Sequence, residues 1–405
     1  MNASAAWQYL EPKVEAINRR INELEWEPSR RNNFVAYRPE RNSPYVEVDG
    51  ERLLMMSGYG YIGLNGDERV VEAAKRALDE YGTGTPGVRA LAGTIPLHEE
   101  LEAEVARFAG REGALVFSSG YAANVGVVGG LCGPGDTILL DKLDHASIVD
   151  GAQLSGATVT RFRHNDPRHL DRRLAATDSS GTRLVVVDSV YSMDGDIAPL
   201  PEIREVCDKH GALLMVDEAH ALGVIGATGR GIEEHFGGEV KADIKVGTLS
   251  KAIPSNGGWI VGSADFLQYL KRLARPFLFS AALAPAQVGA ALEALRILDR
   301  EPERVARTQH ESARFRQLMA DAGMNTGDSE SAVIPLIVGS DENAWEYATA
   351  CRKAGVVGLP VMTPAVPPGL ARLRIAITAA HTPADIDFAV DALLTAARQC
   401  HLIED

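Results

Sequence analysis

Short apolar runs alternate with amphipathic segments along most of the chain. The apolar runs, each typical of a short strand, are "GALVFSS", "DTILLD", "ATVTRFR", "RLVVVDSV", "ALLMVDE", "IKVGT" and "GWIVGS". Segments such as "DERVVEAAKRALDEYG" and "PLHEELEAEVARFAG" carry apolar residues at helical spacing. Apolar strands separated by helices predict an α/β fold with a mostly parallel central sheet, buried on both faces. In such sheets ligands bind beyond the carboxyl ends of the strands.

The pattern changes before this alternating region. Between residue 5 and about residue 27, apolar side chains recur at helical spacing, at Trp7, Leu10, Val14, Ile17, Ile21 and Leu24. Pro28 ends this predicted helix. The run "SPYVEVDGERLLMMSG" then predicts two short strands around an Asp49-Gly50 turn.

The pattern changes again after Pro276 to Pro285. One long helix is predicted over residues 284–323, followed by a strand, a helix, a proline-rich loop from Leu359, a strand and a last helix. We therefore predict a helical arm (1–50) that packs with the small domain, a large domain (51–285) and a small α+β domain (286–405).

Composition and charge exclude several classes of function. The chain has 405 residues and a formal net charge of −14, and so lacks the positive field of a nonspecific nucleic-acid binder. No apolar stretch approaches the roughly 18 residues that a membrane helix needs. The N-terminal residues carry charges throughout and do not resemble a signal peptide. The four cysteines show no metal-binding spacing, and we expect free thiols in a reducing cytoplasm.

Lys251 lies in "VGTLSKAIPSNGGWIVGS", on a glycine-rich turn after a predicted strand. A lysine held on such a turn can form an imine with an aldehyde, and the hydroxyls of Thr248 and Ser250 can bind a phosphate. Together these groups suit pyridoxal phosphate (PLP). Taken alone, a solvated loop lysine is the commoner interpretation.

Asp217 ends the apolar run "ALLMVDE", and His220 follows three residues later. A carboxylate at the end of a buried strand needs a cation, and the protonated ring nitrogen of PLP is one. His220 is placed to reach the phenolic oxygen of the same ring. The alternatives are an aspartate that caps a turn and a histidine on a surface loop.

Ser119, Gly120 and Tyr121 stand between a predicted strand and a predicted helix in "VFSSGYAANVG". Amides at the N-terminus of a helix bind phosphate, and glycine permits close approach. A plain helix cap is the alternative.

Three more polar residues follow predicted strands, and a fourth lies inside one. His145 could stack on a pyridine ring, Asp188 could brace the site, and Ser192 could hydrogen-bond the ring oxygen. A loop histidine and an ordinary acidic turn are the alternatives. Arg374, inside a late strand, suits a substrate carboxylate through two parallel hydrogen bonds. An internal ion pair is its alternative, and Arg372 on the same strand face is its rival.

The order and spacing of these segments resemble the α-oxoamine synthases, a family of fold-type-I PLP enzymes with the aspartate-aminotransferase-like fold. The motifs that carry the resemblance are "GTGTPGVRALAGTIPLHEELE", "FSSGYAAN", "DHASIVDG", "RFRHND", "VYSMDGDIAPL", "VDEAHALGVIGATGRG", "GTLSK" and "RLRIAITAAHTP". They cover roughly residues 45–395. Several of these runs look most similar to bacterial serine palmitoyltransferase, and 8-amino-7-oxononanoate synthase is a sibling group.

The resemblance implies how the cofactor ring is held. Lys251 would form the Schiff base with PLP, and Asp217 would pair with the ring nitrogen. His145 would stack on the ring. Ser192 and His220 would contact the ring oxygen.

The resemblance also implies how the phosphate and the substrate are held. The phosphate would bind the amides of Gly120 and Tyr121 together with Thr248 and Ser250. Arg374 would take the amino-acid carboxylate. Ser280, in "FLFSAALAP", matches a hydroxyl that the family usually supplies across a dimer interface. We therefore expect an obligate homodimer.

Three loops depart from the family pattern. "SGYGYIGL" lacks the family's asparagine, and "AIPSNGG" replaces a run of small residues after the lysine. "VMTPAVPPG" has Met362 and Ala365 where the family has arginine and threonine. These loops shape the substrate side of the site, so the amino acid and the acyl chain stay open. Loss of the loop arginine argues against a pimeloyl-type chain that ends in a carboxylate.

The reaction that the resemblance implies is an acyl transfer. A small α-amino acid (glycine, alanine or serine) would condense with an acyl thioester on coenzyme A or a carrier protein, giving an α-amino ketone and CO2. One alternative is an enzyme of the same fold without decarboxylation, such as an aminotransferase, a glycine C-acetyltransferase or a retro-aldol lyase. The other is a catalytically silent subunit, against which the presence of Lys251, Asp217 and His220 argues.

Overall fold

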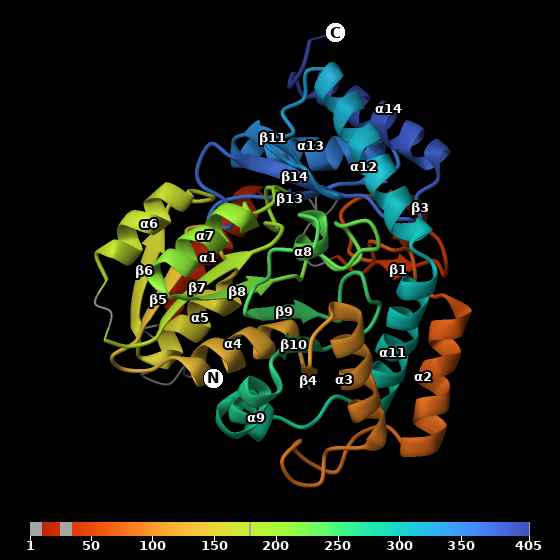
Figure 1. Cartoon of the computed structure of the whole chain (residues 1–405). Coiled ribbons are helices and arrows are strands. Elements are labelled where there is room, and N and C mark those ends of the chain that lie inside the picture. Colours follow the sequence, from red (N-terminus) through yellow and green to blue (C-terminus); the bar gives the residue numbers. More distant parts are fainter. Residues whose placement is uncertain (1–9, 25–34, 178–179, 405) are drawn as a thin grey trace.

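The computed structural model describes residues 10–24, 35–177 and 180–404, and its centre is a seven-stranded sheet (Figure 1). The strands are β4 (Gly113–Phe117), β5 (Thr137–Asp141), β6 (Thr158–Phe162), β7 (Arg183–Asp188), β8 (Leu213–Asp217), β9 (Ile244–Thr248) and β10 (Gly258–Gly262). Their order is β4-β10-β9-β8-β7-β5-β6. β10 runs in the opposite direction to the other six strands, which are parallel to one another. The predicted α/β fold with a mostly parallel sheet is confirmed.

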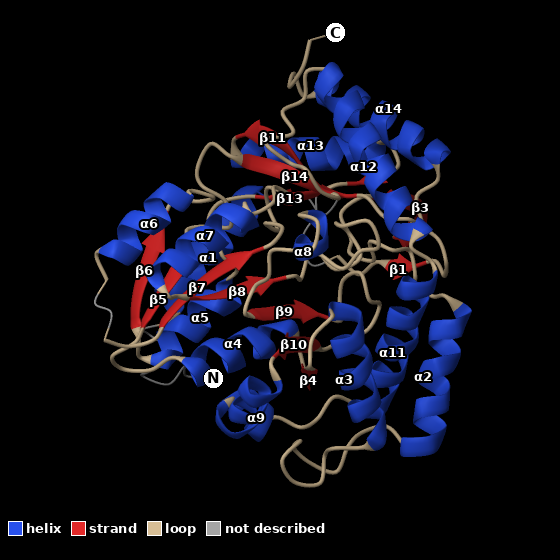
Figure 2. Ribbon diagram, in the orientation of Figure 1, coloured by secondary structure: helices blue, strands red, loops and turns tan. Residues whose placement is uncertain are grey.

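Helices cover both faces of this sheet (Figure 2). Met215 belongs to the core on one face, with residues of α4 (Gly120–Leu131), α5 (Ala146–Ser155), α9 (Ala264–Leu273) and α10 (Arg275–Phe279). Its neighbour Val216 belongs to the core on the other face, because side chains alternate along a strand. That core holds residues of α2 (Glu68–Tyr81), α3 (Pro96–Ala109), α6 (Pro167–Ala175), α7 (Leu200–His210), α8 (Ile232–His235) and α11 (Pro285–Arg300). None of the helices within the described ranges is both long and apolar enough to cross a membrane.

The C-terminal elements gather at one end of the molecule (Figure 1). They are β11 (Val333–Gly339), β13 (Leu359–Val361) and β14 (Ala371–Ala376), which form an antiparallel sheet, with α12 (Glu303–Asp321), α13 (Asp341–Lys353) and α14 (Pro383–Gln399). A further sheet joins β1 (Arg38–Pro39), β2 (Tyr45–Val48) and β3 (Glu51–Met55) to β12 (Val356–Val357). The predicted hairpin at Asp49-Gly50 is confirmed by the pairing of β2 with β3.

The N-terminal helix is only partly described. α1 (Glu11–Leu24) covers the middle of the predicted helix, whereas Trp7 and Pro28 lie outside the described residues. Val14 and Ile17 are 38% and 61% exposed, so their apolar face is open to solvent in the single chain. Packing of this arm on the small domain, like the predicted domain boundaries, stays a prediction.

Two predictions about the C-terminal region are wrong. The single long helix over 284–323 is interrupted, because α11 ends at Arg300 and α12 begins at Glu303. Pro302 explains the break, since its ring disfavours a helical backbone in the residue before it. Glu301 accordingly has φ −125° and ψ 59°. The predicted loop from Leu359 begins instead with β13, which pairs with β14.

Candidate active site

A cavity of about 530 Å³ opens beyond the carboxyl ends of the parallel strands, and residues of β13 and β14 complete its wall. All but one of the predicted site residues line it: Ser119, Gly120, Tyr121, His145, Asp188, Ser192, Asp217, His220, Thr248, Ser250, Lys251 and Arg374. The exception is Ser280, which follows α10 outside the cavity. The parallel topology explains this convergence, because carboxyl ends of neighbouring strands meet at one edge of the sheet.

Lys251 follows the end of β9 by three residues. Its Nζ lies 2.7 Å from Nε2 of His220 and 5.5 Å from the ring centre of Tyr59. Burial lowers the pKa of Lys251 to about 8, although Asp217 and other acidic neighbours oppose this shift. An amine with this pKa is partly deprotonated near neutral pH, as imine formation and base catalysis require.

His220 is buried, so the alternative of a surface loop histidine is wrong. Its Nδ1 lies 2.8 Å from the hydroxyl of Tyr61. Burial and the charge of Lys251 lower the pKa of His220 well below its ordinary value. The imidazole is therefore neutral at physiological pH and can act as a hydrogen-bond partner for the amine.

Asp217 and Asp188 end the neighbouring strands β8 and β7, and both carboxylates line the cavity. Asp217 accepts hydrogen bonds from Nδ2 of Asn124 at 2.7 Å and from the backbone N–H of Ala219 at 2.8 Å. It thus caps a turn as well as facing the cavity. Burial and the charge of Asp217 raise the pKa of Asp188 well above its ordinary value. Oδ1 of Asp188 has no hydrogen-bond partner among the described residues.

A site for an anion lies where β4 leads into α4. Ser119 is the N-cap of α4, and its hydroxyl accepts a backbone N–H of the first turn. The amides of Gly120 and Tyr121 have no acceptor within the helix. A side chain at Gly120 would lie 3.0 Å from Cβ of Thr248, so glycine permits this close approach. The hydroxyls of Thr248 and Ser250 lie 2.7 Å apart, and that of Thr248 also donates to the Gly257 carbonyl at 3.0 Å. Together with the free amides, these hydroxyls surround a position that fits a phosphate.

His145 and Ser192 also border the cavity. His145 is the N-cap of α5, and its Nδ1 lies 2.7 Å from Oγ of Ser147. Burial lowers the pKa of His145, which favours a neutral ring suited to stacking. The carbonyl of Ser192 accepts a hydrogen bond from Nε of Arg374 at 2.6 Å, so β14 holds the Ser192 turn in place.

Arg374 and Arg372 have different roles although they share one face of β14. Arg374 lines the cavity, and besides Ser192 it contacts the hydroxyl of Tyr61 at 3.3 Å. These contacts use two of the five N–H donors of a guanidinium and leave others for a carboxylate. Arg372 is 1% exposed and pairs with Asp194 at 2.6 Å. The internal ion pair therefore describes Arg372, and Arg374 is the residue in the cavity.

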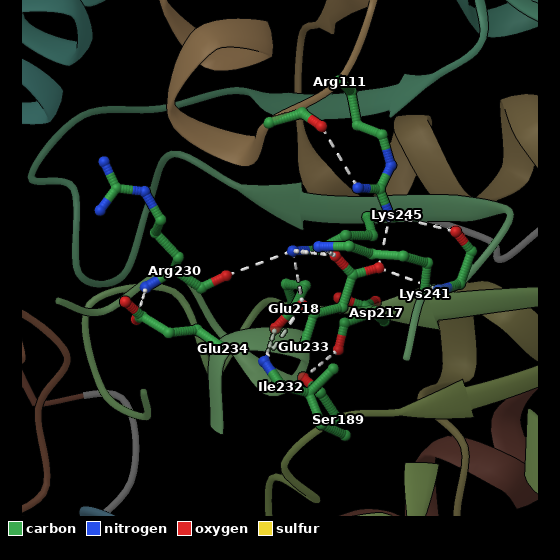
Figure 3. A network of polar contacts seen from close by, with 12 residues as sticks. Arg111, Ser189, Asp217, Glu218, Arg230, Ile232, Glu233, Glu234, Lys241 and Lys245 are labelled. Carbon is green, nitrogen blue, oxygen red and sulfur yellow. Dashed lines mark hydrogen bonds and ion pairs between the residues drawn. The ribbon is translucent and has the colours of Figure 1, made fainter. Parts of the chain in front are cut away.

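On the opposite face of the sheet, behind Asp217, lies a buried network of charged side chains (Figure 3). Lys245 on β9 is 3.0 Å from Glu218 and 3.9 Å from Glu233. All three residues are at most 3% exposed. The Glu218 carboxylate also accepts the N–H of Ile232 at 3.2 Å, and Arg111 pairs with Glu233. Glu218 thereby joins the two ends of the 218–232 loop, which carries His220.

The sequence patterns did not identify three residues of the cavity region: Asn124, Tyr59 and Tyr61. Asn124 had a local signal, because it is one turn after Gly120 in an otherwise apolar helix. Tyr59 and Tyr61 lie in the divergent "SGYGYIGL" run. No local signal connects Tyr61 to His220, from which it is separated by 159 residues along the chain.

These groups fit PLP. Asp217 and Asp188 place two buried carboxyl groups where a cationic ring nitrogen would favour their charged forms. The end of α4 with Thr248 and Ser250 suits the phosphate, and Lys251 suits the aldehyde. The unpaired Oδ1 of Asp188 is the observation that most calls for a further polar partner in the cavity.

Known proteins resemble this chain over most of its length. The family described as aminotransferase class I and II matches residues 39–393. The 8-amino-7-oxononanoate synthase 1 of Bacillus velezensis is 41% identical over 90% of this chain and 93% of that protein. The serine palmitoyltransferase of Sphingobacterium spiritivorum is 39% identical over 91% of this chain and 93% of that protein.

Solved structures give the same result. Sphingomonas wittichii serine palmitoyltransferase has a TM-score of 0.92 and 34% identity over 100% of both chains. Serine palmitoyltransferase solved with PLP as its internal aldimine has a TM-score of 0.88 and 36% identity, over 91% of this chain and 94% of that chain. These matches confirm the predicted fold class, and membership of the family confirms PLP as the cofactor. The chain belongs to the aminotransferase class I and II family and, within it, to the PLP-dependent acyltransferases called α-oxoamine synthases.

Proposed function

We propose that the protein condenses a small α-amino acid with an acyl thioester and releases CO2. The Cα of the amino acid loses a proton and forms a bond to the thioester carbonyl carbon, and the thiol leaves. The carboxyl group then leaves as CO2, Cα regains a proton, and the product is an α-amino ketone. The relatives named above support this class of reaction. These relatives differ in substrate, so the experiment below is designed to identify the amino acid and the acyl group.

One observation carries the proposal. A lysine whose pKa is lowered to about 8 shares a single cavity with a buried carboxylate, Asp217, and a buried arginine, Arg374. The lysine and the carboxylate suit the aldehyde and the ring nitrogen of the cofactor. The arginine adds a third point of attachment for the carboxylate of an amino acid.

The side chains have distinct tasks. Bound PLP withdraws electrons from the amino-acid Cα. Arg374 holds the amino-acid carboxylate and so orients the Cα–H bond. Lys251 takes the proton from Cα and later returns it, which its lowered pKa allows near neutral pH. The Asp217 carboxylate would hold the ring nitrogen, and neutral His220 hydrogen-bonds the amine of Lys251 at 2.7 Å.

The entrance for the acyl chain is apolar. Leu359, Pro360 and Val361 of β13 line the cavity, and Val190 and Met193 lie there too. We propose that this wall contacts the alkyl part of the thioester and excludes water from Cα.

We further propose that the working enzyme is a cytoplasmic homodimer. Leu91 and Phe279 are 84% and 69% exposed, and a bridge between Val88 and Ala281 joins the two segments that carry them. An apolar surface of this kind suits burial against a second copy, which would bring Ser280 to the partner's cavity. Sedimentation of the wild-type protein as a monomer at micromolar concentration would refute the dimer.

The test supplies glycine, alanine or serine with acyl-CoA donors of increasing length, and then with an acyl carrier protein. We expect one free thiol and one CO2 per product, with Lys251→Ala as the inactive control. An aminotransferase would instead need a keto acid and would release neither. Transamination without thiol release would contradict the proposal.

A further inference from the structure

Tyr61 lies in the middle of a hydrogen-bonded chain that joins Arg374 to Lys251. Nη2 of Arg374 is 3.3 Å from the Tyr61 hydroxyl, and that hydroxyl is 2.8 Å from Nδ1 of His220. Nε2 of His220 is 2.7 Å from Nζ of Lys251. Tyr61 is fully buried, and burial raises its pKa, so the hydroxyl keeps its proton. Two neutral side chains thus link the arginine to the amine.

The direction of these hydrogen bonds follows from the chemistry of the groups. An arginine only donates, so the Tyr61 oxygen accepts from Arg374. A buried hydroxyl needs an acceptor for its own proton, and Nδ1 of His220 is the acceptor in contact with it. A neutral imidazole that accepts at Nδ1 carries its proton on Nε2, which faces the lone pair of Lys251. Tyr61 therefore selects the His220 tautomer that stabilises the uncharged amine.

Other charged groups face the two ends of this chain. Asp217 and Asp188 favour the charged form of Lys251, and Arg374 disfavours it. Lys251, Arg374 and His145 all disfavour a charged His220. A carboxylate on Arg374 would compensate the guanidinium charge and compete for its N–H donors. Both effects shift Lys251 toward its protonated form.

We propose that Tyr61 is a positioning residue that couples carboxylate binding at Arg374 to the proton state of Lys251 through the tautomer of His220. The inference rests on the role proposed above for Arg374. Without a carboxylate, the chain favours the free amine of Lys251, which is the form that captures PLP or takes a proton. With the carboxylate seated, Lys251 holds a proton more readily, which suits the step in which it receives the proton of Cα.

The first experiment reads the His220 tautomer by NMR of the full-length protein with ¹⁵N-labelled histidine, before PLP is added. His220→Gln identifies the resonances. We expect the Nε2–H tautomer in the wild type and a mixture of tautomers in Tyr61→Phe. Tyr347→Phe is the matched control, because it removes another buried hydroxyl, one that bonds the Leu393 carbonyl at 3.1 Å. An unchanged tautomer in Tyr61→Phe would overturn the proposal.

The second experiment measures the rate of PLP capture against pH, followed by absorbance, because only the free amine of Lys251 condenses. Acetate serves as a carboxylate without an amine. In the wild type, acetate should raise the midpoint by about 0.5 to 1 pH unit. In Tyr61→Phe the midpoint should start higher and respond about half as much, since only the direct field of Arg374 remains. A purely structural role of Tyr61 would lower stability without changing this response.

The outcomes separate the two proposals. A wild-type midpoint that acetate leaves unmoved would overturn both the carboxylate role of Arg374 and the coupling. A wild-type shift that Tyr61→Phe retains in full would overturn the coupling alone. Loss of the shift in Arg374→Gln together with a reduced shift in Tyr61→Phe supports both.

Discussion

Two adjacent carboxylates at the end of β8 have opposite surroundings. Asp217 faces the cavity, where its hydrogen-bond donors are the side-chain amide of Asn124 and a backbone N–H. Glu218 faces the other side of the sheet, where Lys245 pairs with it at 3.0 Å (Figure 3). The Asp217 carboxylate is therefore available to pair with a cationic ligand, whereas the Glu218 carboxylate already pairs with a lysine of the protein. Both carboxylates are buried, so burial does not distinguish the functional one. The lack of a paired cation from the protein does.

The largest expected effect comes from the cavity face. Lys251→Ala should lower turnover by about 10⁴-fold or more, since one residue both attaches the cofactor and moves the proton. The absorbance of PLP bound to the lysine should disappear. Lys241→Ala is the matched control, because it removes a half-exposed lysine of the opposite network and should keep both signals. Substantial turnover in Lys251→Ala would exclude the proposed mechanism.

The opposite face should respond through stability. Glu218→Gln removes the nearer of the two carboxylates that pair with buried Lys245 and leaves it the Arg230 carbonyl at 3.2 Å and Glu233 at 3.9 Å. The free energy of unfolding should therefore fall by about 3 kcal/mol, the lower end for a broken buried pair. The double variant Glu218→Gln/Lys245→Met should recover much of this loss, because no unpaired charge remains. Denaturant unfolding of the wild type, of Glu218→Gln, of Lys245→Met and of the double variant measures the coupling. A loss below about 1 kcal/mol in Glu218→Gln would show that the pair behaves like an exposed one.

Asp217→Asn should give the reverse pattern. Turnover should fall by about 10²–10³-fold, as expected when a preorganised charge beside the reacting system is removed. The free energy of unfolding should stay level or rise, because a buried carboxylate is replaced by a neutral isostere. Steady-state kinetics and denaturant unfolding together test this. A loss of stability equal to that of Glu218→Gln would remove the distinction between the two faces.

The smallest effect is the pH dependence of stability before PLP is added. The pKa of Lys251 falls from 10.5 to about 8 on folding, so the unfolded chain binds more protons between these values. The contribution of Lys251 therefore makes the free energy of unfolding rise with pH across that window, and its full penalty is present below it. Lys251→Met should lack this rise. The quantity to compare is the difference between the two proteins, and a difference that is flat across the window would refute the lowered pKa.

The strand ends were predictable because their signals are local. An apolar run followed at once by a polar residue placed Asp188 and Asp217 at carboxyl ends of parallel strands. The break at Pro302 also had a local cause, which the amphipathic pattern on either side concealed. The contacts of Tyr61 had no local signal in the sequence, because Arg374, which it touches, lies 313 residues away along the chain.

The sequence by itself determined the α/β fold and the set of reactive groups, since strand periodicity and neighbouring residues act over a few positions. Only the tertiary structure decided which groups meet. Arg372 and Arg374 share one strand face and differ by two positions, roughly 6.6–7 Å, so periodicity could not separate them. Their different distances from the turn at Ser192 and Asp194 made one a wall of the cavity and the other a structural ion pair. These distances depend on how β14 packs against a turn about 180 residues earlier in the chain. No local sequence pattern predicts a contact between segments so far apart.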